Sequence, residues 1–399
     1  MARQRITIIS IYYPPEQGAA ASRIAKLASG LLARNVDVNV VTALPNYPKG
    51  RIFSNYRGKI AVSEVLEGIP IRRYWLYASN SKSKIKRILN MISFSAMLLL
   101  AFPHLRRMRP EMIIVNSPPL LVGFAGVTLA RILRTSIIAN ISDIWPMSAL
   151  ELGALHRGRF YSLLERIEGY IYRHSDAILT QSTETLDHIV ERCPGTKAFL
   201  YRNLDYKSDY IDNYPPMHDR PLRLVYAGLL GVAQGVYDLC RSIDFPSLGA
   251  ELHLYGNGNE RADLVRYIEE TPGCGIYLHD MVRKEEMPAL LSQYHATIVP
   301  LKTDIRGAFP SKIYMAIAAA LPVFFCGSGE GAKFVNDTRV GWVSPPGDYD
   351  GLRDNIEILD AMSNQDYDLL RKHIKSLATG TFDPDEQLDH LIEFIEAVR

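Results

Sequence analysis

The feature that most constrains this chain is a repeated alternation of short apolar segments with amphipathic ones. The first half contains the apolar runs RITIISIYY, VDVNVVTAL, EMIIVNSPP, TSIIANISD and DAILTQS, and stretches such as ASRIAKLASGLLARN, with apolar residues at helical spacing, lie between them. Near-continuous apolar runs separated by amphipathic helices are typical of parallel strands covered on both faces. The pattern therefore predicts a doubly wound α/β domain.

The alternation stops at the polar, tyrosine-rich segment YRNLDYKSDYIDNYPPMHDRP, which is typical of a linker, and then restarts. The later strands are expected at LRLVYAGLL, AELHLYGNG, GIYLHDM, ATIVPL and PVFFCG, and the chain closes with helical segments. At 399 residues the chain is also too long for one ordinary core. We predict two doubly wound Rossmann-like domains, residues 1–205 and 206–370, that face a central cleft, followed by closing helices at 371–399. Ligands are expected beyond the carboxyl ends of the strands.

Composition excludes several classes of protein. The formal net charge of +2 gives no support to nucleic-acid binding, and the four cysteines are widely spaced, which argues against a disulfide framework or a zinc site. The histidines show no metal-binding spacing such as HExxH, and no GxSxG motif is present. The N-terminal sequence lacks the layout of a signal peptide. These features predict a cytoplasmic protein without a metal ion or a bound cofactor.

One span is strongly basic. Residues 68–110 contain nine lysines and arginines and no acidic residue, and they include the apolar stretch KIKRILNMISFSAMLLLAFPHLRRMR. Its apolar core of roughly a dozen residues is short for a transmembrane helix, which needs about 20. Two interpretations remain open. The segment is either a buried helix with solvated basic ends or a helix at the surface of an anionic inner leaflet.

Three turns in the second half suit a phosphate group. GLLGVAQGV places Gly231 and Gln234 between a strand and a helix, and LYGNGNER places Gly256 and Glu260 after another strand. Pro310, Ser311 and Lys312 open an apolar helix, where backbone N–H groups, the helix dipole and a lysine favour an anion. Neither GxGxxG nor GxxxxGK[ST] occurs. We expect the three turns to lie on one rim of the sheet.

Two stretches in the first half are weaker candidates. In YYPPEQGAAASR, Gly18 lets the backbone approach a ligand at a helix start, and Glu16 and Arg23 could contact that ligand; alternatively this is an ordinary strand-to-helix turn with a surface ion pair. In NISDIWPMSALELG, Asp143 suits binding of a hydroxylated ring, or it caps the next helix.

The segments YYPPEQGAAASRIAKLASGLL, TALPNYPKG, SDIWPMSALELG, GLLGVAQGV, YGNGNE and PSKIYMAIAAALPV occur in an order that resembles family-4 retaining glycosyltransferases of the GT-B fold. Within that family the chain looks most like enzymes that transfer N-acetyl-L-fucosamine or related sugars in O-antigen and capsule assembly. The resemblance implies an N-terminal acceptor domain, a C-terminal nucleotide-sugar domain and a last helix that crosses back to the first domain.

The resemblance also implies roles for residues. Asp143 would be the catalytic residue at the sugar end of the site, and Gly18 would lie near the donor diphosphate. The remaining donor-binding residues would be Gly231, Gln234, Gly256, Glu260, Pro310, Ser311 and Lys312. Those near the acceptor would be Glu16, Arg23, Asn46 and Tyr47. The implied reaction is retaining transfer from a nucleotide-sugar, such as a UDP-linked N-acetylated hexosamine, to a lipid-linked or growing glycan at the inner membrane face, without a metal or a protein nucleophile.

The chain departs from the family pattern at specific positions. Gly307 and Met315 stand where the family usually has two glutamates, one for the sugar and one for the ribose. Met147 stands where close relatives have another glutamate. The turn just before Gln234 lacks the arginine that many family members place there. Asp304, Arg306 and Glu330 are candidates to compensate. Two other functions therefore stay open: a non-catalytic partner that kept the GT-B fold, and a sugar-nucleotide epimerase of the same shape.

Overall fold

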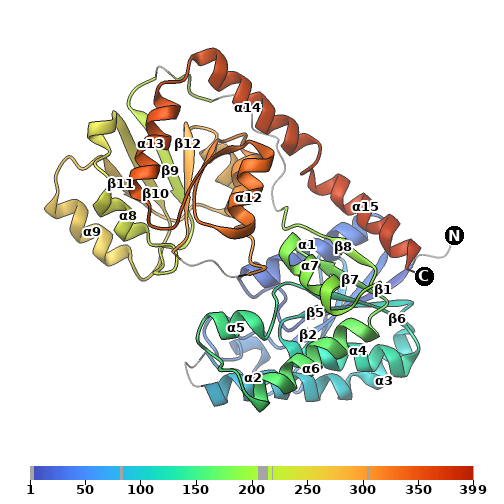
Figure 1. Cartoon of the computed structure of the whole chain (residues 1–399). Coiled ribbons are helices and arrows are strands. Elements are labelled where there is room, and N and C mark those ends of the chain that lie inside the picture. The colour runs from blue at the N-terminus through green and yellow to red at the C-terminus, as the bar shows by residue number, and fades with distance from the viewer. Residues whose placement is uncertain (1–3, 81–83, 205–213, 218, 303–305, 399) are drawn as a thin grey trace. The chain divides into compact units, whose positions relative to one another are not determined.

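The computed structural model describes residues 4–80, 84–204, 214–217, 219–302 and 306–398, and its chain divides into two compact units (Figure 1). The first unit comprises Met1–Arg202 and Leu388–Arg399, and the second comprises Asn203–Gln387. Residues 205–213 of the expected linker, and Asp304, lie outside the described residues. Each unit contains one sheet with helices on both faces, so the predicted fold class of two Rossmann-like α/β domains is confirmed.

The described part of the first unit contains an eight-stranded sheet with the order β3-β4-β2-β1-β5-β6-β7-β8. Only β3 runs antiparallel to its neighbour. The strands are β1 (Arg5–Ile9), β2 (Asp37–Ala43), β3 (Ala61–Leu66), β4 (Ile69–Tyr74), β5 (Met112–Ser117), β6 (Ser136–Ile141), β7 (Ala177–Thr180) and β8 (Ala198–Leu200). The sequence analysis predicted β1, β2, β5, β6 and β7 but missed the hairpin of β3 and β4, because its polar and charged residues hide the apolar pattern.

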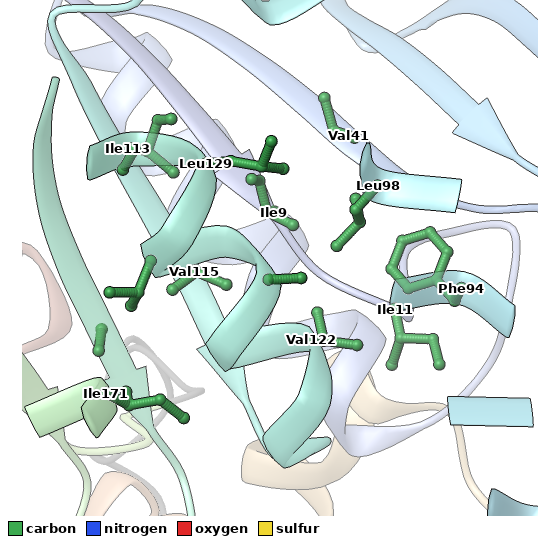
Figure 2. Close-up of a cluster of buried hydrophobic side chains, with 14 of the residues drawn as sticks. Ile9, Ile11, Val41, Phe94, Leu98, Ile113, Val115, Val122, Leu129 and Ile171 are labelled. Carbon is green, nitrogen blue, oxygen red and sulfur yellow. The ribbon is translucent and has the colours of Figure 1, made fainter. Parts of the chain in front are cut away.

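Helices cover both faces of this sheet. They are α1 (Ala19–Ala33), α2 (Lys84–Leu100), α3 (Phe102–Met108), α4 (Leu120–Leu133), α5 (Met147–Glu151), α6 (Arg159–His174) and α7 (Thr183–Arg192), with the 3₁₀ turn η1 (Ser54–Tyr56). Successive strand residues supply opposite faces: Ile8 packs with α1, whereas Ile9 packs with α2, α4 and α6 (Figure 2). The last helix, α15 (Pro384–Ala397), buries Leu388 and Leu391 in the same core as α1.

The second unit has an all-parallel sheet of six described strands in the order β11-β10-β9-β12-β13-β14. The strands are β9 (Leu222–Ala227), β10 (Ala250–Tyr255), β11 (Ile276–His279), β12 (Ala296–Pro300), β13 (Val323–Cys326) and β14 (Gly341–Ser344). The helices are α8 (Val236–Ser242), α9 (Arg261–Glu270), α10 (Met287–Leu291), α11 (Lys312–Ala318), α12 (Gly329–Thr338), α13 (Tyr349–Asp360) and α14 (Asn364–Thr379), with η2 (Pro246–Leu248) and η3 (Lys284–Glu286). The short strand β14 was not predicted.

Candidate active site

Both sheets reverse their winding direction at one pair of strands. In the first unit β1 lies between β2 and β5, and in the second β9 lies between β10 and β12. Ligands of doubly wound sheets bind beyond the carboxyl ends of the strands at such a reversal. The turns that follow β1 and β9 carry Gly18 and Gly231, which are two of the residues predicted from the sequence. The topology therefore predicts that ligands bind at these two turns.

In the second unit the turns after β9 and β10 touch backbone to backbone. The N–H of Gly228 donates to the carbonyl of Tyr255 (2.8 Å), and the N–H of Leu230 donates to that of Asn257 (3.0 Å). A Cβ atom at Gly256 would lie 1.8 Å from the carbonyl oxygen of Gly228, so no larger residue fits there. The two glycine-rich turns consequently form one rim at the carboxyl end of the sheet.

Lys312, the first residue of α11, extends to this rim. Its Cε would lie 2.3 Å from a Cβ on Gly228, and its Nζ lies 5.3 Å from the ring centre of Tyr226. Among the described residues no carboxylate lies within ion-pair distance of its ammonium. Burial lowers the pKa of Lys312. A desolvated cation without a protein counter-ion, beside two backbone turns, is suited to an anionic ligand.

Gln234 belongs to the same rim. Its backbone N–H donates to the carbonyl of Gly231 (3.0 Å), whereas its side-chain Oε1 is buried and has no hydrogen-bond partner in the described part of the chain. Buried polar atoms are normally paired. Gln234 therefore has an unused acceptor close to the turn that the sequence analysis selected.

The other predicted donor residues have structural partners. The Glu260 carboxylate is buried and accepts the N–H of Tyr237 (3.2 Å), and the Glu260 N–H donates to Leu230 (3.0 Å), so this residue braces the rim. Pro310 and Ser311 accept the N–H groups of Ile313 and Met315, which fixes the start of α11. That helix has only seven residues, so Lys312 contributes more to an anion site than the helix dipole.

The two positions without the expected glutamates have clear environments. Met315 is buried in the apolar cluster that α11 and α14 share, together with Ile374 and Phe382. Gly307 is buried and has a φ of 82°, in the left-handed region where a glutamate would be strained. Position 315 therefore serves the core, and the backbone at 307 favours glycine.

In the first unit Glu16 organises the turn after β1. Its buried carboxylate accepts the N–H groups of Asn46 (2.8 Å), Tyr47 (2.9 Å) and Tyr13 (3.3 Å), and the side-chain amide of Asn46 (3.2 Å). Burial raises the pKa of Glu16, and these hydrogen bonds act in the opposite direction. A Cβ on Gly18 would lie 3.1 Å from the ring of Tyr47. Glu16 and Gly18 thus hold the segment that contains Asn46 and Tyr47.

A pocket of about 400 Å³ opens beside these residues. Among the described residues its lining carries no charged side chain and is rich in amide and hydroxyl groups: Tyr12, Asn46, Tyr47, Pro48, Gly50, Ser79, Asn80, Asn90, Met91 and Pro119. Neutral amides and tyrosine rings suit a hydroxylated, uncharged ligand. Two of the four predicted acceptor residues, Asn46 and Tyr47, therefore line this pocket, and Glu16 supports them from behind.

Asp143 and Arg23 form a separate group in the first unit. Asp143 follows β6, and among the described residues no donor lies within hydrogen-bond distance of its carboxylate. Burial raises the pKa of Asp143, and the charge of Arg23 lowers it. Arg23 donates to the side chain of Gln181. The helix α5 has Pro146 as its N-cap and no side-chain cap, so the alternative that Asp143 caps this helix is wrong.

Four polar residues of the pocket were not predicted from the sequence: Tyr12, Ser79, Asn80 and Asn90. Asn90 was the most visible of them, because a single asparagine within an apolar helical stretch is unusual, and it is buried. Asn80 donates to the carbonyl of Pro48 (3.2 Å), a contact between residues far apart in the sequence. In the described part of the chain no group of three His, Cys, Asp or Glu side chains is placed to bind a metal ion.

The sequence matches known glycosyltransferase domains in both units. Residues 18–197 match the glycosyl transferase 4-like domain, and residues 221–360 match glycosyl transferases group 1. A protein of Escherichia coli K12, provisionally named the colanic acid biosynthesis glycosyl transferase WcaI, is 23% identical over 334 residues, which are 79% of this chain and 81% of that protein.

Two solved structures share the fold. Sucrose-phosphate synthase from Thermosynechococcus elongatus superposes with a TM-score of 0.71 at 16% identity and covers 100% of both chains. HepE from Anabaena, in complex with UDP, gives a TM-score of 0.69 at 12% identity and covers 99% of this chain and 100% of HepE. Two glycosyltransferase domains in succession, each on its own Rossmann-like sheet, identify this chain as a family-4 glycosyltransferase of the GT-B fold.

Proposed function

We propose that the protein transfers a sugar from a UDP-linked donor, with retention of configuration and without a metal ion, to a lipid-linked or growing glycan during surface-polysaccharide assembly at the cytoplasmic face of the inner membrane. The second unit binds the nucleotide-sugar, and the first unit binds the acceptor.

The observation that carries the proposal is the anion site around Lys312. A lysine with a lowered pKa and no described carboxylate partner lies against the turn at Gly228, which is hydrogen-bonded to the turn that carries Gly256. The diphosphate of a nucleotide-sugar supplies the missing negative charge. When the glycosidic bond to the phosphate breaks, more charge develops on the leaving diphosphate, and a preorganised cation stabilises it. Lys312 then performs the task for which other transferases use a metal ion.

Asp143 is the proposed catalytic residue at the sugar. Its carboxylate lacks a described protein donor, so it is available to accept hydrogen bonds from sugar hydroxyls. In a front-face displacement the acceptor hydroxyl attacks on the side from which the diphosphate leaves and passes its proton to the departing phosphate oxygen, so no protein nucleophile is needed. The acceptor binds in the neutral pocket of Asn46, Tyr47 and Asn90, where amide and hydroxyl groups match a glycan.

The comparisons support the nucleotide and the pathway. HepE, which shares the fold, was solved with UDP bound, and WcaI, the E. coli relative, is named for colanic acid biosynthesis. From these we infer UDP as the nucleotide and a surface polysaccharide, of the O-antigen or capsule type, as the product. The N-acetylated hexosamine of the donor rests on the resemblance of the sequence alone.

The loss of the two glutamates lowers the expected affinity. A carboxylate contact to the ribose contributes about 1.5–3 kcal/mol as a charged hydrogen bond. Because Met315 belongs to the core and Gly307 has left-handed backbone, neither position supplies that contact. We expect UDP to bind in the micromolar range or more weakly, with Lys312 as the main determinant.

Calorimetric titration with UDP, GDP and their sugar conjugates tests the proposal. We expect binding of UDP and one UDP-sugar, a large loss in Lys312→Ala, and no loss in the matched control Lys333→Ala, whose exposed lysine lies on α12. A folded protein that binds none of these nucleotides would refute the donor site and favour the non-catalytic partner. Transfer that survives EDTA would support metal independence, and transfer that requires added Mg²⁺ would refute it.

A further inference from the structure

The helix α2 has two apolar faces. Its inner face contributes Phe94 and Leu98, both fully buried among Ile11 and Val41 in the core of the first unit (Figure 2). This face explains why α2 packs on the sheet. It confirms that the basic, apolar stretch forms a helix with one side in the core, as the first of the two sequence-based interpretations requires.

The opposite face is also apolar, although it is exposed. Ile88, Leu89, Ile92, Leu99 and Leu100 are 39%, 45%, 46%, 54% and 64% exposed. Residues at these spacings lie on one side of a helix. We call these five residues the outer face of α2. The neighbouring helix α4, which contacts α2, adds the exposed Phe124 and Ile132. An exposed apolar face of this kind on one helix marks an interaction site in soluble proteins.

The charges around the outer face select one kind of partner. The outer face lies within the acid-free sequence span of residues 68–110, and Lys86, Arg106 and Arg107 are exposed before and after the apolar residues in the chain. A protein partner would need an apolar patch with acidic flanks. An anionic lipid surface offers both features at once, since acyl chains receive the apolar side chains and headgroups attract the basic ones.

The helix is suited to lie along a membrane rather than to cross it. Among the described residues no single helix is long and apolar enough to span a bilayer. Only the helix pair Ile88–Leu100 and Phe102–Met108, bent by 49°, has the necessary length and apolar composition when both helices are taken together. Spanning would also remove Phe94, Leu98 and Leu105 from the core, where each is fully buried. Lying in the interface keeps these contacts.

The same helix lines the acceptor pocket. Asn90 and Met91 are part of the pocket wall, and the side-chain amide of Asn90 donates to the carbonyl of Tyr77 (2.8 Å). The hydroxyl of Ser93 accepts the N–H of Tyr77 (2.8 Å), which fixes α2 to the chain that leads to Ser79 and Asn80. A ligand in the pocket and a partner at the outer face would therefore contact the same helix, α2.

We propose that α2 is an interfacial helix whose outer face inserts into an anionic bilayer, so that the acceptor pocket opens beside the lipid surface. The docking surface stands on exposure and charge alone. Only the delivery of a lipid-linked acceptor from the bilayer to the pocket rests on the proposed function.

Vesicle co-sedimentation of the full chain tests this proposal. We expect the wild type to bind phosphatidylcholine vesicles that contain phosphatidylglycerol, and to bind pure phosphatidylcholine vesicles much less. The double variant Ile92→Glu/Leu99→Glu should bind at least tenfold more weakly. The matched control Ile358→Glu/Leu369→Glu changes two equally exposed apolar residues on α13 and α14 and should bind like the wild type. Equal binding by both double variants, or no vesicle binding by the wild type, would overturn the proposal.

Two further measurements separate the remaining outcomes. Light scattering without lipid reports whether the outer face joins two copies of the chain; a wild-type dimer that Ile92→Glu/Leu99→Glu dissociates would overturn the proposal. UDP titration of the same variant reports on the donor site, which belongs to the other unit. Loss of vesicle binding by the double variant, with UDP binding retained, supports the interfacial helix. A wild-type protein that binds vesicles but not UDP would refute the proposed function and leave the helix assignment standing.

Discussion

Replacing Lys312 with methionine should separate stability from nucleotide binding. In the absence of ligand the ammonium forms no described ion pair, and its main contact is the Tyr226 ring at 5.3 Å. Such a cation–π contact contributes about 0.5–1 kcal/mol. The loss is offset because the variant no longer desolvates a charge, so we expect the free energy of unfolding to change by less than about 1 kcal/mol. The lost charged hydrogen bond to the diphosphate should cost about 1.5–3 kcal/mol of binding.

Two assays on the same preparation test this prediction. Urea denaturation measures the free energy of unfolding, and calorimetry measures the dissociation constant of UDP, which should rise roughly 10- to 150-fold. The pH dependence adds a check. Because the pKa of Lys312 is lowered in the folded protein, the unfolded chain binds the proton more tightly, so the contribution of Lys312 to stability should become more favourable as pH rises toward about 10.4 and less favourable as pH falls. Lys312→Met should lack this contribution.

Either of two results would refute the reasoning. If Lys312→Met binds UDP as tightly as the wild type, Lys312 is not the diphosphate cation. If the variant unfolds several kcal/mol more easily, the lysine has a structural role that its contacts do not explain. Lys333→Met, at an exposed position on α12, is the control for changing a lysine in the same unit.

Three other changes follow from the close contacts of the site. Gly256→Ala should destabilise the second unit by at least about 2 kcal/mol, because its Cβ would lie 1.8 Å from the Gly228 carbonyl, whereas Gly158→Ala, with open space around its Cβ, should be nearly neutral; thermal unfolding compares them, and equal stabilities would contradict the prediction. Glu16→Ala leaves four N–H contacts without their acceptor and should cost about 2–4 kcal/mol in urea denaturation, with a smaller loss in Glu16→Gln. Asp143→Asn should keep or raise stability at neutral pH, since burial raises the pKa of this carboxyl and its charged form is the costly one, while transfer falls about 100-fold in an assay with a UDP-sugar; full activity would show that the carboxylate is not catalytic.

The sequence predicted the regular elements of the fold well and the irregular ones poorly. Buried strands such as β5 and β9 consist mostly of apolar residues, so their pattern is visible locally. The edge hairpin of β3 and β4 was missed because it contains Glu64, Arg72 and Arg73, which look like loop residues. In the structure Arg73 is fully buried and pairs with Glu64. The pairing with Glu64 across the hairpin, and a hydrogen bond to the distant Pro14 carbonyl, make that arginine acceptable inside the sheet.

The candidate site shows the same division. The turns with Gly231 and Gly256, and the lysine at 312, were predicted from the sequence because their signal is local: small residues directly after strands and a cation at the start of a helix. The Asp143 alternatives could not be separated from the sequence, since capping and ligand binding use the same residue type at the same place. The structure separates them, because the α5 N-terminus has no side-chain cap.

By itself, the sequence determined that the chain forms two doubly wound α/β domains, since the order of apolar and amphipathic segments leaves few other ways to bury them. It also determined where glycines follow strands and where a lysine begins a helix. Only the tertiary structure decided that Asn46, Asn80 and Asn90 meet in one pocket, that Lys312 has no described counter-ion, and that α2 is apolar on both its buried and its exposed side. Burial and charge pairing depend on which distant segments come together, and no local pattern encodes that.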